Sequence, residues 1–219
     1  PDVIADNDEG YLKANYNYSN LKTQTFWRSR KVRFDIVNSF QLPSFIQMEP
    51  AWLDYDIYDI EAQHLFTLGD FGNIMGGLNY RLVTLSSNYL ESKGVNLYAG
   101  FLQYEFKPIQ SLILNVGVRL DKQDYLGLNT SPRGAVIFTP AKNHSIRASI
   151  STAFRNPTFV DLYPDVTVSP FPGFGITVTG NEDLKPERII SYDLGYHTTV
   201  FQRLKATLDL FYYEMRDFI

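Results

Sequence analysis

The side chains that most often do chemistry in proteins are few and widely spaced in this chain. Its three histidines, His64, His144 and His197, match neither the HExxH spacing of a zinc site nor a Ser-His-Asp arrangement. The chain has no cysteine, which excludes thiolate metal sites and disulfide scaffolds. The glycine-rich stretch GDFGNIMGG lacks the lysine and the following helix of a phosphate-binding loop. We therefore expect no enzyme, no metal site and no bound cofactor.

One acidic string, LDYDIYDIE, offers carboxylates of the kind that a hard cation such as Ca²⁺ prefers. Its acids, Asp54, Asp56, Asp59 and Glu61, lack the glycine-centred loop spacing of a calcium-binding motif. We expect a solvated strand edge near the outer rim of the fold instead of a metal site.

A second stretch, GNEDLKPE at residues 180–187, places turn residues and charges directly before the alternating segment RIISYDLGYHTTV. Gly180 and Asn181 both tolerate positive φ, so they can turn the chain out of a loop. Pro186 biases Lys185 toward extended backbone and suits the first position of a strand. The stretch is thus predicted to end a loop and start a strand.

Composition indicates a β-rich chain without a nucleic-acid partner. The formal net charge is −4, whereas phosphate binding needs a basic face. The chain contains 15 Tyr and 16 Phe, residue types that favour strands. The absence of a run of about 18 apolar residues excludes a transmembrane helix, but transmembrane strands need only about 9–11 residues and stay possible.

Alternation of apolar and polar residues predicts about nine strands. In LILNVGVRLD, for example, Leu112, Leu114 and Val116 share one face, and Asn115 and Arg119 lie on the other. The strands are expected to start near Tyr11, Leu53, Asn73, Val95, Ser111, Pro132, His144, Arg188 and Leu204. Many extend for roughly ten residues or more, whereas strands of soluble proteins usually have about 5–6.

Short and long connections alternate between these strands. LGDFGN, FKPIQS and TPAKNH are tight turns, and VFQRL is equally short. Longer links are expected between them, at about residues 29–52, 84–94, 124–131 and 155–186. This alternation, with aromatic residues near the ends of the apolar faces, is typical of an outer-membrane β-barrel. A soluble β-sandwich that binds sugar or protein through its loops also alternates and is the alternative at this point.

The carboxy-terminal third of the chain resembles a known family. The segments SISTAFRNPTFVDLY, GNEDLKPERIISYDLGY and LKATLDLFYYEMRDFI are similar to the end of the barrel of TonB-dependent outer-membrane receptors. The residues that carry this signature are Arg155, Pro157, Gly180, Asn181, Leu184, Lys185, Pro186 and Glu187. Upstream hairpins resemble the same barrel more loosely, so the likeness covers most of the chain.

The resemblance implies an all-β fold, an antiparallel up-and-down transmembrane β-barrel in the outer membrane of a Gram-negative bacterium. Barrels of this family have about 22 strands. Residues 1–219 would then be one partial barrel domain, a fragment without the plug domain, signal peptide and final strands.

The function that the resemblance implies is active uptake of a scarce ligand. This ligand is most often an iron–siderophore complex, and otherwise cobalamin, haem or an oligosaccharide. The implied partners are outer-membrane lipid and an inner-membrane energy-coupling protein that acts through the missing plug.

The resemblance also implies where a ligand would bind. Ligands of the family meet the extracellular loops, and the loop at residues 155–184 offers Arg155, Tyr163, Phe171 and Phe174. Arginine gives charge-assisted hydrogen bonds and the rings give contact area, although each could instead pack within the loop or lie at the lipid interface. A second, polar set is expected to face the lumen of the barrel and contact the plug: Asn79, Arg81, Gln103, Glu105, Arg119, Asp121, Arg147, Asp193 and Lys205.

Overall fold

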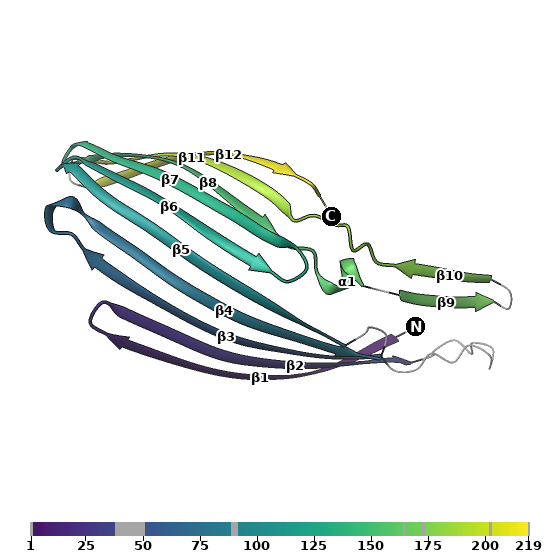
Figure 1. Ribbon diagram of the computed structural model, residues 1–219. Helices are drawn as coiled ribbons and strands as arrows, with labels where there is room; N and C mark the ends of the chain where they lie inside the picture. Colours follow the sequence, from purple (N-terminus) through teal and green to yellow (C-terminus); the bar gives the residue numbers. More distant parts are fainter. Residues whose placement is uncertain are drawn as a thin grey trace.

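The computed structural model describes residues 2–37, 51–88, 92–163, 165–171, 174–201 and 203–218 (Figure 1). Ten long strands form the main sheet: β1 (Asp2–Tyr18), β2 (Leu21–Val37), β3 (Ala51–Thr67), β4 (Asn73–Ser87), β5 (Lys93–Ile109), β6 (Leu112–Gln123), β7 (Gly127–Ala141), β8 (His144–Arg155), β11 (Glu187–Val200) and β12 (Leu204–Arg216). The remaining elements are a 3₁₀ turn η1 (Gly69–Phe71), a short helix α1 (Phe159–Leu162) and a hairpin of β9 (Asp165–Phe171) and β10 (Phe174–Thr179). None of the described residues forms a helix long and apolar enough to cross a membrane.

Neighbouring strands of the main sheet are antiparallel throughout, and their order follows the chain from β1 to β8 and then to β11 and β12. The hairpin β9–β10 forms a separate two-stranded sheet between β8 and β11. The main sheet is curved and open, with β1 and β12 as its two edges within the described residues (Figure 1). This is the predicted all-β, antiparallel meander, in the form of part of a barrel wall.

Five tight turns lie at one end of the sheet, opposite the end at which both termini and the longer connections lie (Figure 1). They join β1 to β2, β3 to β4, β5 to β6, β7 to β8 and β11 to β12. Backbone hydrogen bonds link neighbouring hairpins at this end: Leu65 N–H to Asn20 O (3.0 Å), Thr139 N–H to Ser111 O (2.7 Å) and Thr199 N–H to Asn143 O (2.9 Å). The four predicted tight turns are confirmed, and a fifth joins β1 to β2.

The sequence prediction missed one long strand. β2 occupies Leu21–Val37, whereas we expected one strand near Tyr11 followed by a link over 29–52. Its sequence KTQTFWRSRKVRF has polar residues on both faces, which hides the period-two pattern. A two-residue turn, Ser19–Asn20, precedes it, and Ser19 has a positive φ of 51°. Residues 38–50, the centre of the predicted link, lie outside the described residues.

Two other links differ from the prediction. β7 starts at Gly127 and not near Pro132, so the link expected at 124–131 is only the turn 124–126. Gly127 has a positive φ of 75°, which a residue without Cβ adopts at little cost. The loop expected at 155–186 contains α1 and the β9–β10 hairpin, which the sequence pattern did not reveal.

The two faces of the sheet differ in polarity. We call the face against which α1 packs the inner face and the opposite one the outer face. Apolar side chains on the outer face of the central strands form an uncovered band, in which Leu78 is 71% exposed, Val116 55% and Ile150 48%. In a soluble sandwich a second sheet would bury these side chains. The ten long strands instead form one continuous sheet that leaves this band exposed, so the sandwich alternative is wrong.

Toward the end of the sheet that carries the termini, the two faces exchange their character. On β3, Asp54 and Asp56 lie on the outer face, while Leu53 and Tyr55 lie on the inner face. β3 has 17 residues, whereas a membrane-spanning strand needs only about 9–11. The strands therefore continue beyond the apolar band, and in β3, β4 and β5 this extension has a polar outer side and an apolar inner side.

We expect a charged side chain in the outer apolar band to destabilise the protein. Val116→Arg, introduced into the protein that contains this chain, should lower the unfolding free energy in a bilayer by about 2–4 kcal/mol, because the guanidinium then faces hydrocarbon. The matched change Ser29→Arg, on the outer face of the extension, should cost less than about 1 kcal/mol. Denaturant titration in lipid vesicles measures both costs, and equal values would contradict the division into two zones.

Candidate ligand-binding site

An apolar pocket of about 350 Å³ lies on the inner face, between α1 and the extended ends of β3, β4 and β5. Sheet residues form its floor, and residues 157–163 form its roof. It is lined by Leu53, Tyr55, Val83, Leu85, Val95, Leu97, Gln123, Tyr125, Pro157, Thr158, Phe159, Leu162 and Tyr163. Val95 is only 3% exposed and Leu162 4%. The roof is therefore packed onto the floor and is not a free loop.

Two side chains at the start of α1 fix its conformation. The N–H and the Oγ1 of Thr158 both donate to Oδ2 of Asp161, each at 2.7 Å. The bond from the Thr158 N–H is the half of a capping box in which the carboxylate satisfies a backbone donor that the helix leaves unpaired. The hydrogen bond from the Thr158 hydroxyl, and then that from its backbone, hold the pKa of Asp161 below its ordinary value.

The signature stretch connects α1 to the sheet. The N–H of Asn181 donates to the backbone oxygen of Asp161 at 3.1 Å, and the side-chain oxygen of Asn181 accepts the N–H of Asp183 at 3.0 Å. Neither Gly180 nor Asn181 has a positive φ, so our expectation on this point was wrong. The Asn181 side chain makes the turn instead. Leu184, Lys185 and Pro186 then lead into β11, and the strand start predicted there is confirmed.

Arg155, one of the expected ligand-binding residues, is engaged in an ion pair. Its Nε and Nη2 donate to the two carboxylate oxygens of Glu187, at 2.7 and 2.9 Å. A bidentate pair of this kind fixes the geometry of both side chains. Arg155 and Glu187 are also register partners, so the pair joins the end of β8 to the start of β11. The charge of Arg155 is therefore paired with that of Glu187 at the base of the loop.

The other expected loop residues have different positions. Tyr163 lies in the roof of the pocket. Phe171 ends β9 and Phe174 starts β10, where their backbones are register partners. The side chains of Phe171 and Phe174 lie outside the described residues.

Sequence reasoning missed two residues that contact Tyr163: Tyr125, which lines the pocket, and Lys93, which lies beside it. Nζ of Lys93, at the start of β5, lies 3.9 Å from the centre of the Tyr163 ring and 6.0 Å from that of Tyr125. The two rings meet edge to face, with centroids 6.0 Å apart. Burial raises the pKa of Tyr163, which keeps its hydroxyl neutral beside the ammonium group. Lys93 lay in a predicted link, and nothing in the sequence pattern relates it to a tyrosine 70 positions later.

Closer to the tight turns, the inner face becomes polar. The register places all nine polar residues expected there on this one face: Asn79, Arg81, Gln103, Glu105, Arg119, Asp121, Arg147, Asp193 and Lys205. Several pair with neighbours on the same face. Arg119 contacts Asp121 at 2.9 Å, Gln103 accepts a hydrogen bond from Arg133, and Asp193 accepts one from Ser191 at 2.9 Å.

The best-satisfied member of this polar face is Asp59, which is only 5% exposed. Arg81 Nε donates to its carboxylate at 2.8 Å, and Asn79 Nδ2 lies 3.2 Å from both carboxylate oxygens. A buried carboxylate needs such partners because an uncompensated charge is costly.

The acidic string that contains Asp59 is not a strand edge, and this expectation was wrong. β3 pairs with β2 on one side and with β4 on the other. Alternation sends Asp54 and Asp56 to the outer face but Asp59 and Glu61 to the inner face, so the four acids do not converge. Among the described residues no group of three or more acids and histidines could hold a metal ion.

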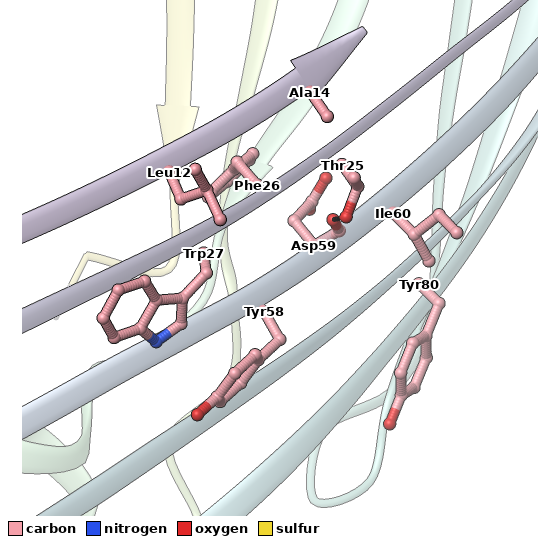
Figure 2. Close-up of a pocket in the computed structure, with 9 residues that line it drawn as sticks. All are labelled: Leu12, Ala14, Thr25, Phe26, Trp27, Tyr58, Asp59, Ile60 and Tyr80. Carbon is pink, nitrogen blue, oxygen red and sulfur yellow. Dashed lines mark hydrogen bonds between the residues drawn. The ribbon is translucent and has the colours of Figure 1, made fainter. Parts of the chain in front are cut away.

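A second hollow, of about 280 Å³, lies on the outer face where the apolar band ends (Figure 2). Trp27, Tyr58 and Tyr80 project from neighbouring strands around it, with Leu12 and Ile60 beside them (Figure 2). Aromatic side chains at this level are typical of the girdle that meets the headgroup region of a membrane. We assign this hollow to the lipid interface and not to the ligand site.

An open antiparallel wall with an apolar outer band, an aromatic girdle and a polar inner face defines the class of protein: an outer-membrane β-barrel. Residues 3–219 match the family described as TonB dependent receptor-like, beta-barrel. The chain therefore belongs to the TonB-dependent receptors, as its signature indicated, and it is an outer-membrane protein.

Relatives and solved structures agree with this family. The iron-regulated outer membrane virulence protein of Vibrio cholerae serotype O1 is 28% identical over 159 residues, which cover 71% of this chain and 23% of that protein. The siderophore receptor PirA from Pseudomonas aeruginosa has a TM-score of 0.75 at 17% identity, over 97% of this chain and 39% of that chain. A mutant ferric enterobactin receptor, PfeA from Pseudomonas aeruginosa, in complex with enterobactin has a TM-score of 0.73 at 19% identity, over 97% and 35%.

This chain thus spans about a quarter of the curated relative's length and over a third of the first structure's. The family matched over residues 3–219 is one of receptors, which confirms the non-enzymatic prediction.

The lowered pKa of Asp161 predicts that acid loosens the pocket roof. A carboxyl group with a depressed folded-state pKa stabilises the fold above its unfolded pKa, and this contribution is lost as the pH falls through the folded value. Hydrogen exchange at the Thr158 amide should therefore speed up below about pH 4. Asp161→Ala should show fast exchange at neutral pH as well, whereas the control Asp183→Ala should not. Exchange at Thr158 that follows only the intrinsic pH dependence would contradict the role of Asp161.

Proposed function

We propose that this chain is part of the barrel of a receptor that takes up an iron–siderophore complex, and that the pocket under α1 contacts the ligand. Residues 1–219 would form one segment of a single barrel domain, a reading that the family match over 3–219 supports. In outer-membrane barrels the short turns face the periplasm, so the pocket end of the sheet is extracellular. The inner face then lines the lumen.

The observation that carries the proposal is the chemistry of the pocket. It combines an apolar floor with Tyr55, Tyr125 and Tyr163 and one lysine, Lys93, at its edge. Rings offer stacking area to the aromatic or apolar parts of a chelate, and an ammonium group in a partly desolvated site attracts its negative charge. The names of the relatives, an iron-regulated protein and two siderophore receptors, support the same ligand class.

The polar inner face suggests how the rest of the receptor would use this wall. Side chains such as Arg119, Arg147 and Asp193 would hydrogen-bond a plug domain within the barrel, and the plug would connect the site to an inner-membrane energy-coupling protein. Arg147 and Asp209 are only loosely paired, at 3.9 Å, and are exposed on this face. Polar groups of this kind can exchange their partners when a plug moves.

Substitution of Lys93 tests the ligand site. In the complete receptor, Lys93→Gln should weaken binding of ferric enterobactin by roughly 10- to 100-fold, the range expected when a charged hydrogen-bond donor is lost. Lys93→Arg should retain most of the affinity. The matched control Lys31→Gln removes an exposed lysine from the outer face and should have no effect. Quenching of intrinsic fluorescence on titration with the ferric complex measures the dissociation constant.

The same titration with haem, cobalamin and a ferric hydroxamate separates the ligand classes. Binding of haem or cobalamin but of neither iron chelate would overturn the siderophore assignment. Equal affinities of the Lys93→Gln variant and the unsubstituted receptor for the ligand that binds would move the site away from this pocket.

A further inference from the structure

Three neighbouring tight turns form a positively charged rim at the end of the sheet opposite the pocket. The turns join β5 to β6, β7 to β8 and β11 to β12, and the hydrogen bonds of Thr139 to Ser111 and of Thr199 to Asn143 hold them side by side. All of them carry exposed cations. We call these three residues the basic rim: Lys107, Lys142 and Arg203.

Acidic side chains near these turns are directed to the inner face. Glu105 lies 3.7 Å from Lys107, and Asp209 lies 3.9 Å from Arg147. Glu105 and Asp209 both belong to the polar inner face by register. The next turn of the sheet, between β3 and β4, carries Asp70, so the positive charge is not a property of the whole end.

On the outer side of the sheet, the turns at the basic rim expose apolar side chains. Polar side chains follow next to them along the strands. Phe201, in the β11–β12 turn, is 90% exposed, and Ile109 and Leu204 are also exposed. Among these polar groups, Nδ1 of His144 lies 2.6 Å from Oη of Tyr196 and 3.2 Å from Oγ1 of Thr198. The register continues this line on the outer face with Ile146 and Leu208, which belong to the apolar band.

We propose that the basic rim binds anionic phospholipid headgroups of the membrane's periplasmic leaflet. Lys142 and Arg203 lie where the phosphate would be, because their turns are adjacent and project beyond the apolar band. The hydroxyl groups of Tyr196 and Thr198, with His144, lie at the level of the glycerol and ester oxygens. The acyl chains then follow the apolar outer face, and Phe201 inserts beside them. The apolar surface, the polar belt and the cations thus follow one another in the same order as the acyl chains, the glycerol and ester oxygens, and the phosphate of a phospholipid.

Charge complementarity selects this occupant over a neutral lipid. A cation close to an anionic bilayer surface contributes about a fivefold gain in binding. The site is independent of the pocket under α1, because the two lie at opposite ends of the strands (Figure 1). Its test therefore does not depend on the identity of the transported ligand.

The experiment uses the complete receptor in nanodiscs of phosphatidylethanolamine with and without phosphatidylglycerol. Native mass spectrometry after partial delipidation counts the phosphatidylglycerol molecules that stay bound. The triple variant Lys107→Gln, Lys142→Gln, Arg203→Gln should retain at least about tenfold less phosphatidylglycerol and the same amount of phosphatidylethanolamine. The matched triple Lys31→Gln, Lys122→Gln, Lys185→Gln removes three exposed lysines at the other end and should retain phosphatidylglycerol normally.

Three outcomes would overturn the proposal. Equal losses in both triple variants would show a general effect of net charge, and unchanged retention in the basic-rim variant would show that these cations do not hold lipid. Retention that does not distinguish the two lipids would show an apolar annulus only. Heat-modifiable migration confirms that each variant is folded. If the triple variant does not insert, the single variants Lys142→Gln and Arg203→Gln carry the test, each with a severalfold loss expected.

Discussion

Continuous backbone pairing between neighbouring strands is the constraint on which the rest of this structure depends. In hydrocarbon an unpaired N–H or C=O group costs several kcal/mol, so strands that cross a membrane must satisfy each other. From β1 to β12 the antiparallel register supplies these partners and leaves only two edges within the described residues. The same register decides which side chains share a face, because a slip of one residue would move every side chain to the opposite side. The burial of Asp59 beside Arg81 and Asn79 follows directly from this pairing.

The exchange of polarity along the strands divides this wall into two parts with different tasks. Within the band, apolar side chains such as Val116 face outward and polar ones face inward, as lipid outside and a hydrated interior require. Beyond the band the outer face carries Asp54 and Asp56, and the inner face carries Val83 and Val95, which α1 covers. One continuous sheet thus anchors the protein in the membrane and also supplies the floor of a pocket outside it. The floor of the pocket is part of the rigid sheet, whereas its roof is held by a few hydrogen bonds around Asp161.

The accuracy of the sequence prediction followed the clarity of the local pattern. LILNVGVRLD became β6 and RIISYDLGYHTTV became β11, because one apolar and one polar face at period two have few competing interpretations. β2 was missed because polar residues occupy both of its faces in the extension, so apolar residues do not recur there with a period of two. The wrong interpretation of LDYDIYDIE had the same origin, since its acids straddle the level at which the faces exchange.

The sequence by itself determined most of the long strands, the alternation of tight turns with longer links at most positions, the polar and apolar faces, and the family. These properties depend on residues close together in the chain, whose backbone preferences and periodicity act locally. Only the tertiary structure decided that Lys93 meets Tyr163, that Asn181 supports Asp161 and that Arg155 is committed to Glu187. These partners come from different strands and connections, and the register and the folding of residues 157–163 onto the inner face bring them together. A contact between distant segments depends on where their backbones are placed, and a local pattern does not contain that information.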